Sequence, residues 1–140
     1  MFAKLTQLAA TTVAVLAMSM TASAAPATTQ TLARRNVGDA TFFHPGLGAC
    51  GFFNTNANMI TAVSASFFDN FSGATPNPNL NPICGRPISV SAKGKTIIVT
   101  VVDRCAGCPG AGDLDLSPAA FDQLADPSVG RIHGVQWSFI

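Results

Sequence analysis

The clearest alternation of apolar and polar positions lies between residues 86 and 102. Apolar and polar residues alternate from Ile88 to Ala92, Lys93-Gly94 follows as a tight turn, and residues 96–102 form a nearly continuous β-branched run. Alternation with period two is typical of a strand with one buried face, whereas a continuous run is typical of a strand buried on both faces. The segment therefore predicts a hairpin whose second strand is central.

Three further stretches predict strands. Residues 37–43 and 59–63 are rich in β-branched, aromatic or other apolar side chains, which favour extended structure. In residues 132–140 apolar and polar side chains alternate, and Trp137 falls among the apolar ones. We therefore expect one face of this last strand, including Trp137, to lie in the core.

Two short helical segments are expected. Ser117-Pro118 opens one, because serine is a favoured N-cap and proline fits the first helical position, and Asp126-Pro127 ends it. Residues 66–71 are expected to form a short helical turn. Many short strands, with no alternation of strands and long helices, predict a mainly β barrel or sandwich.

The N-terminal residues have the pattern of a secretory leader. Residues 1–24 contain one lysine, an apolar run and a small-x-small motif ending at Ala24, which predicts a signal peptide cleaved after that residue. A membrane anchor is the alternative, but the run is short for a span of roughly 20 residues. Residues 25–35 are interpreted as a propeptide processed after Arg35 or as a retained tail. Residues 36–140 then form one domain of a secreted, extracellular protein.

The charge of this domain limits its partners. Of the eight Lys and Arg residues, three lie within residues 1–35, so five remain against seven Asp residues, a net charge of about −2. Such a domain has no basic face that could neutralise phosphates, so nucleic acid is excluded as a partner. We expect no membrane association after removal of the signal, and a monomer.

Four cysteines in a secreted chain indicate disulfides. Cys105-Ala106-Gly107-Cys108 could instead form a redox pair or a zinc knuckle, but it lies between a strand and a Gly/Pro loop, and no second Cys-x-x-Cys is present. Of the three possible connectivities we predict Cys50–Cys84 and Cys105–Cys108. We expect no metal and no cofactor.

Five segments carry a resemblance to a known family. In chain order they are Gly38-Asp39-Ala40-Thr41-Phe42-Phe43, Gly48-Ala49-Cys50-Gly51, Ile83-Cys84-Gly85 with Val99–Cys105, Asp113–Phe121, and Gly130–Trp137. Together they resemble the fungal expansin-like proteins called loosenins, which are grouped with RlpA-like domains, barwin, plant expansin N-terminal domains and family-45 endoglucanases. The resemblance implies a six-stranded double-psi β-barrel with an open polysaccharide-binding groove, and non-hydrolytic loosening of cell-wall polysaccharides.

The resemblance also suggests site residues. Asp115 matches the groove aspartate of expansins, which is the general acid in the endoglucanases, and Asp103 matches an aspartate of the bacterial lytic enzymes. His44 stands where the endoglucanases carry their catalytic base, and the chain has no tyrosine. The histidine that the lytic enzymes use is also missing, from residues 61–66. Glycoside hydrolysis normally needs two carboxylates, so this pattern favours binding without hydrolysis.

The remaining candidates have structural alternatives. Phe43 and Phe53 are candidate sugar-stacking rings, and Phe53 is the preferred exposed platform. Asp103 could instead cap a turn or pair with Arg104. Asp113 is expected to be a solvated loop residue, and His133 a hydrogen-bonded structural residue. Asn70-Phe71-Ser72 is a glycosylation sequon.

The sequence therefore predicts a protein that binds cellulose-type or chitin-type polymers in a groove formed by five residues: Phe43, His44, Phe53, Asp103 and Asp115. Two other classes remain open. Some small RlpA-like domains inhibit papain-type cysteine proteases, and the Asn/Pro-rich loop of residues 73–82 could serve that purpose. The other class is a weak glycoside hydrolase or lytic enzyme.

Overall fold

The computed structural model describes residues 34–140. The predicted signal peptide, residues 1–24, and all of the predicted propeptide except Arg34 and Arg35 lie outside the described residues. The strands are β1 (Asn36–Phe42), β2 (Ile60–Ser64), β3 (Pro87–Ala92), β4 (Lys95–Cys105), β5 (Leu114–Leu116) and β6 (Ile132–Phe139). Two α-helices, α1 (Ala65–Asp69) and α2 (Pro118–Leu124), and two short 3-10 helices, η1 (Pro78–Leu80) and η2 (Pro127–Val129), connect them.

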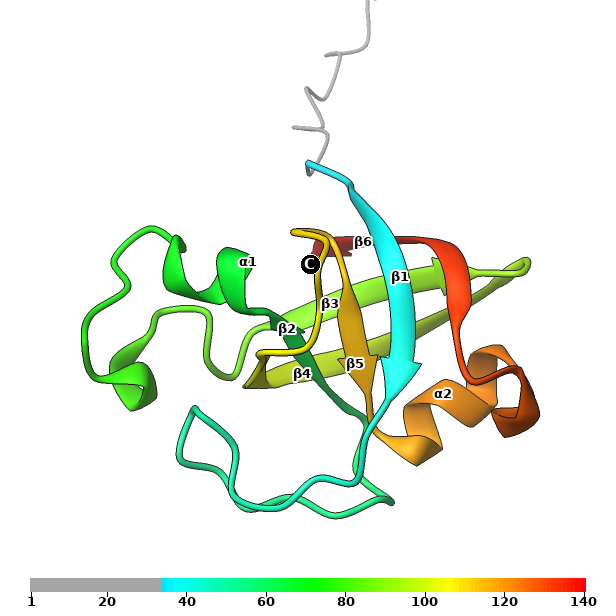
Figure 1. Cartoon of the computed structure of the whole chain (residues 1–140), viewed down its shortest axis with the longest axis horizontal. Coiled ribbons are helices and arrows are strands. Elements are labelled where there is room, and N and C mark those ends of the chain that lie inside the picture. Colours follow the sequence, from blue (N-terminus) through cyan, green and yellow to red (C-terminus); the bar gives the residue numbers. More distant parts are fainter. Residues whose placement is uncertain (1–33) are drawn as a thin grey trace, which may run out of the picture. The chain divides into compact units, whose positions relative to one another are not determined.

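The six strands form a closed barrel in the order β1-β5-β2-β4-β3-β6 (Figure 1). Two neighbouring pairs are parallel, β1 with β5 and β2 with β4, and the other pairs are antiparallel. The predicted mainly β fold with six strands and short helices is confirmed. Because most neighbours in the barrel are distant in the sequence, loops from different parts of the chain meet at the same rim.

The core follows the predicted alternation. Val90 and Trp137 are opposite each other on β3 and β6, and both are buried. The indole Nε1–H of Trp137 donates to the carbonyl oxygen of Gly112 at 2.8 Å, which satisfies its polar group inside the barrel. The placement of Trp137 in the core is confirmed.

One prediction for β4 is wrong. We expected it to be buried on both faces, but Ile98 is 58% exposed. The reason is that β4 is long: Lys95–Val99 pairs only with β3, Thr100 pairs with both β2 and β3, and Val101–Cys105 pairs with β2. The first half of β4 is therefore one arm of a hairpin that extends beyond its pairing with β2.

The structure contains both disulfides in the predicted connectivity. Cys50–Cys84 ties the loop between β1 and β2 to the segment before β3, and Cys105–Cys108 closes the turn after β4. Each bridge spans a Cα–Cα distance of 5.5 Å. Within residues 34–140, no helix has the length and apolar character required to cross a bilayer.

Candidate functional site

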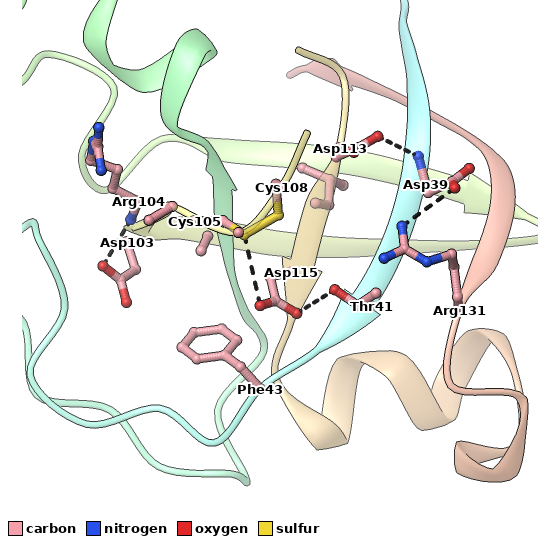
Figure 2. A pocket seen from close by; sticks show the side chains of 14 residues that line it. Asp39, Thr41, Phe43, Asp103, Arg104, Cys105, Cys108, Asp113, Asp115 and Arg131 are labelled. Atoms are coloured by element: carbon pink, nitrogen blue, oxygen red, sulfur yellow. Dashed lines mark hydrogen bonds and ion pairs between the residues drawn. A yellow bond between two sulfur atoms is a disulfide. The ribbon is translucent and has the colours of Figure 1, made fainter. Parts of the chain in front are cut away.

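A partly open cavity of about 270 Å³ lies where β1, β4 and β5 meet the loop between β4 and β5. Figure 2 shows the carboxylates of Asp103 and Asp115 pointing towards the space beside Phe43. The lining residues are Asp39, Thr41, Phe43, Ala62, Asp103, Arg104, Cys105, Ala106, Gly107, Cys108, Asp113, Leu114, Asp115 and Arg131. The loop residues of this group are held in place by the Cys105–Cys108 disulfide.

Asp115 lies at the centre of the cavity because of the alternation in β5. Leu114 and Leu116 on either side of it are buried in the core, so its own side chain points out of the barrel. Asp115 is in register with Thr41 on parallel β1, and the Thr41 hydroxyl donates to Asp115 Oδ1 at 2.7 Å. Cys105 Sγ lies 3.9 Å from Asp115 Oδ2, but this disulfide sulfur carries no hydrogen and donates no bond.

The protonation of Asp115 reflects this environment. Partial burial raises the pKa of its carboxyl group, because the charged form loses hydration. The hydrogen bond from Thr41 and the positive charge of Arg131 lower the pKa, while the negative charge of Asp103 raises it further. The net result is a pKa above the ordinary aspartate value. The Asp115 carboxyl group therefore keeps its proton to a higher pH than a solvated aspartate does.

Asp103 has a structural contact as well as a place in the cavity. Its Oδ1 accepts hydrogen bonds from the backbone N–H groups of Ala49 at 2.7 Å and Arg104 at 2.8 Å. The Arg104 guanidinium does not pair with Asp103; it donates to both carboxylate oxygens of Asp69, at 2.7 and 2.6 Å. Asp103 thus fixes the loop between β1 and β2 through one oxygen. Its other oxygen has no hydrogen-bond donor among residues 34–140.

The expectation that Asp113 would be solvated is wrong. Asp113 is only 7% exposed, and its carboxylate accepts from the N–H of Asp39 at 2.9 Å and from the N–H of Gly110 at 2.8 Å. Its own carbonyl oxygen accepts from Ser64 N–H at 3.1 Å. Asp113 therefore ties the loop before β5 to β1 and to the end of β2, and shapes the cavity without offering it a free carboxylate.

Three residues that line the cavity, Asp39, Arg131 and Thr41, were not predicted as site residues. Asp39 Oδ2 lies 2.8 Å from His133 Nδ1 and 3.4 Å from Arg131 Nη1. Desolvation raises the pKa of Asp39. The hydrogen bond and the charge of His133, and hydrogen bonds from Gly134 N–H and Arg131, lower it by more, so the net pKa lies below the ordinary aspartate value. Thr41 is the third. A signal was available for β1, because Asp39, Thr41 and Phe43 are two residues apart and share one face of a strand.

One group in the cavity has the composition of a metal site but not its chemistry. Ligand atoms of Cys105, Cys108 and Asp115 lie within 4.8 Å of one another. The two sulfurs are joined in a disulfide, and metals bind the thiolate. This group cannot hold a metal ion while the disulfide is intact.

Two predicted groove residues lie outside the cavity. Phe53 is 77% exposed and forms an isolated β-bridge with Leu47, and His44 is exposed with its Nδ1 3.2 Å from Asn56 Oδ1. Both belong to the loop between β1 and β2. The cavity therefore brings together Phe43, Asp103 and Asp115 of the five predicted residues. Asn70 is exposed at the end of α1, with its Nδ2 donating to Ser66 O at 2.8 Å.

Residues 35–137 match the model of a double-psi β-barrel family described as lytic transglycolase. The chain belongs to this family. The double-psi β-barrel expected from the five sequence segments is thereby confirmed, and the RlpA-like relationship with it.

Two relatives match over most of the barrel. An Asp f 7 allergen homolog from Arthroderma benhamiae is 38% identical over 117 residues, which is 74% of this chain but 38% of that protein. A papain inhibitor from Streptomyces mobaraensis is 34% identical over 128 residues, covering 89% of this chain and 85% of the inhibitor. The chain thus spans less than half of one relative and most of the other.

Solved structures give the same picture. A Streptomyces papain inhibitor superposes with a TM-score of 0.68 at 35% identity, covering 76% of this chain and 94% of that one. An expansin from Clavibacter michiganensis, in complex with cellohexaose, superposes with a TM-score of 0.61 at 27% identity, covering 76% of this chain and 50% of that one. The barrel is therefore similar both to an expansin solved with cellohexaose and to a papain inhibitor.

The chemistry available in the cavity of this double-psi β-barrel follows from its carboxylates. Asp115 can accept a hydrogen bond through Oδ2, or donate one when protonated. Asp103 can accept through its second oxygen, while both Asp113 oxygens are used by backbone N–H groups. The aromatic ring of Phe43 adds an apolar surface beside them. Acceptors next to an aromatic ring suit the hydroxyl groups and the apolar face of a sugar.

Proposed function

We propose that this double-psi β-barrel binds a cell-wall polysaccharide in the Asp115 cavity and weakens contacts between polymer chains without cutting them. The observation that carries the proposal is the position of Asp115: a half-buried carboxylate on β5, held by Thr41, with Oδ2 directed into a cavity beside Phe43. The similarity to an expansin solved in complex with cellohexaose supports a sugar ligand. The partner is a cellulose-type or chitin-type polymer, and the proposed location is extracellular.

Binding without hydrolysis is supported by the state of the other acidic groups. A glycosidase needs a second carboxylate that is free to activate water or attack carbon. Both Asp113 oxygens accept backbone N–H groups and Asp39 is paired with His133, so neither is free; Asp103 keeps one free oxygen, and the assay below tests whether it acts as a second carboxylate. His44, which stands where the endoglucanases carry their catalytic base, lies outside the cavity. We therefore propose a binding protein and not an enzyme.

The test is a pull-down on insoluble cellulose and chitin, combined with an assay for released reducing sugar. The wild-type protein is expected to bind at least one polymer and to release no sugar above background. Asp115→Asn keeps the side-chain shape and should lose binding, whereas Asp122→Asn, at an exposed position on α2, should bind like wild type. Equal binding by wild type and Asp115→Asn would reject the site, and sugar release would reject the non-hydrolytic function.

A second candidate is inhibition of a papain-type protease. It is favoured by the papain inhibitor structure, because this chain covers 94% of that protein at 35% identity. The loop of residues 73–82, which includes η1, would then contact the protease. A papain activity assay with the purified barrel tests this directly: inhibition at stoichiometric concentration, unaffected by Asp115→Asn, would favour the inhibitor over the polysaccharide-binding protein.

A further inference from the structure

Two carboxylate oxygens in the cavity have no hydrogen-bond donor among residues 34–140. The first is Asp115 Oδ2, whose one recorded contact is with the disulfide sulfur Cys105 Sγ at 3.9 Å, which has no hydrogen to donate. The second is Asp103 Oδ2, since its partner oxygen takes both backbone N–H groups. Figure 2 shows both carboxylates on the same opening above Phe43. The cavity thus offers a ligand two free acceptor oxygens.

The charge of the cavity is also unbalanced. Four aspartates and two arginines line it. The Arg104 guanidinium forms an ion pair with Asp69, which lies outside the cavity, through hydrogen bonds of 2.7 and 2.6 Å. Arg131 lies 3.4 Å from Asp39, which His133 also contacts. Neither Asp103 nor Asp115 forms an ion pair within residues 34–140, although the charge of Arg131 acts on Asp115, and burial leaves Asp115 incompletely hydrated.

We propose that the cavity selects a polymer of amino sugars whose amino groups are free and protonated, such as partly deacetylated chitin, over neutral glucan or fully N-acetylated chitin. This inference rests on the proposed polysaccharide-binding function and specifies its substrate class. An ammonium group carries three N–H donors and a positive charge, so it can donate to a free carboxylate oxygen that no protein donor reaches. Charge-assisted hydrogen bonds of this kind are roughly twice as strong as neutral ones.

The proposal predicts a characteristic dependence on pH. The groups around Asp115 are Asp39 and Thr41 on β1, Asp103 and Arg104 on β4, Asp113 before β5, Arg131 before β6, and His133 on β6. Burial raises the pKa of Asp115, so acidification removes its charge earlier than for a solvated aspartate. At higher pH the sugar amine loses its proton. Binding of the amino-sugar polymer should therefore pass through a maximum between these two titrations.

The experiment is isothermal titration calorimetry with three soluble hexamers, of glucosamine, N-acetylglucosamine and β-1,4-linked glucose, at low ionic strength. We expect the glucosamine hexamer to bind about tenfold more tightly or better. This advantage should decrease with added salt and be lost in alkaline solution. Asp115→Asn and Asp103→Asn should each remove the advantage, whereas Asp122→Asn should retain it. Thermal unfolding of each variant checks that the barrel is intact.

The outcomes distinguish a failure of the amino-sugar preference from a failure of the proposed polysaccharide binding. If all three hexamers bind equally and Asp115→Asn abolishes binding of each, the cavity binds sugar but the preference for a charged amine is wrong. If the glucosamine hexamer binds more tightly and the preference survives in both variants, the charge lies elsewhere on the surface and the assignment is wrong. If no hexamer binds at any pH, the polysaccharide-binding function fails as well.

Discussion

At the scale of single residues, the cavity depends on where alternation places an aspartate. Asp115 separates two core leucines, so its carboxylate must lie outside the barrel wall, and the parallel partner Thr41 holds one of its oxygens. This is a position with a cost: the charged form is partly desolvated and one oxygen lacks a donor. A residue of purely structural importance would be expected to have its hydrogen bonds complete.

Removal of the Asp115 charge should therefore not destabilise the protein. The pKa of Asp115 is raised in the folded state, so folding favours the protonated form and the charged form lowers stability above that pKa. Asp115→Asn should have a melting temperature equal to or higher than wild type at pH 7. The difference should disappear near pH 3, below the ordinary pKa of about 3.9, where wild type is protonated in both states. Calorimetry across this pH range is the measurement; a variant that loses more than about 1 kcal/mol at pH 7 would show that the carboxylate is a structural acceptor.

Gly112 is required for close packing of the loop before β5 against β1. A Cβ atom there would collide with the carbonyl oxygen of Val37, and Gly112 O also accepts the indole N–H of Trp137. Gly112→Ala should separate the loop from β1 and cost about 2–3 kcal/mol, in the range of overpacked cores. Gly107→Ala is the matched control in the same loop, since a Cβ there meets nothing within 4 Å. Equal unfolding midpoints in urea for the two variants would contradict this packing.

Sequence alone located some of these residues and not others. Alternation and family resemblance pointed to Trp137 in the core and to Asp115 in the groove. Asp113 was misjudged because nothing local indicates that the N–H of Asp39, far away in the chain, would be its partner. Arg131 was missed for the same reason: it enters the cavity through the pairing of β1 with β6, which local patterns do not reveal.

At the scale of elements, the apolar and polar patterns of the sequence predicted the longer strands but not the shortest one, β5. β5 has three residues, too few to show a period, yet it carries Asp115 and joins β1 to β2. The extent of β4 was predicted well, but its burial was not, because burial depends on which half of β4 lies beside β2. The caps at Ser64 and Ser117 start both helices, and the cap at Ser117 was readable from Ser117-Pro118.

The position of β1 affects processing after Arg35. Asn36, Val37 and Gly38 follow at once and are paired with β6, and the Arg35 guanidinium donates to Gln136 at 3.3 Å. A protease needs this backbone extended and unpaired in its own active site. We predict that trypsin-like cleavage after Arg35 is at least tenfold slower in the native protein than in the reduced, denatured chain. Mass spectrometry of a digestion series measures this; equal rates would mean that the start of β1 opens freely.

The two disulfides should differ in their effect on stability. Cys50–Cys84 closes a loop with a sequence separation of 34 and Cys105–Cys108 one of 3, so the loop-entropy model gives about 4 kcal/mol for the first and about 2 kcal/mol for the second. Replacing Cys50 and Cys84 by serine should lower the free energy of unfolding more than the same change at Cys105 and Cys108. The latter pair should instead weaken sugar binding, because it frees the cavity loop. Urea unfolding and calorimetry distinguish the two effects, and a reversed order would contradict the account.

At the scale of the whole molecule, one barrel has relatives with different partners. The expansin and the papain inhibitor share this fold with the chain, so the barrel alone does not select between a polysaccharide and a protease. The partner therefore depends on the loops and side chains around the barrel. The cavity around Asp115 has groups that suit a sugar. The loop of residues 73–82 belongs to a different segment, which the Cys50–Cys84 disulfide joins to the rest of the domain. A protein that used only this loop would have no need of a desolvated carboxylate in a cavity.

The most direct test is a titration of the isotopically labelled barrel with β-1,4-linked glucose, N-acetylglucosamine and glucosamine hexamers, followed by amide chemical shifts. The account predicts saturable shifts for residues 41–43, 103–108 and 113–116 with at least one hexamer, and their absence in Asp115→Asn. Shifts confined to residues 73–82, or no shifts with any of the three sugars, would contradict the placement of polysaccharide in the Asp115 cavity.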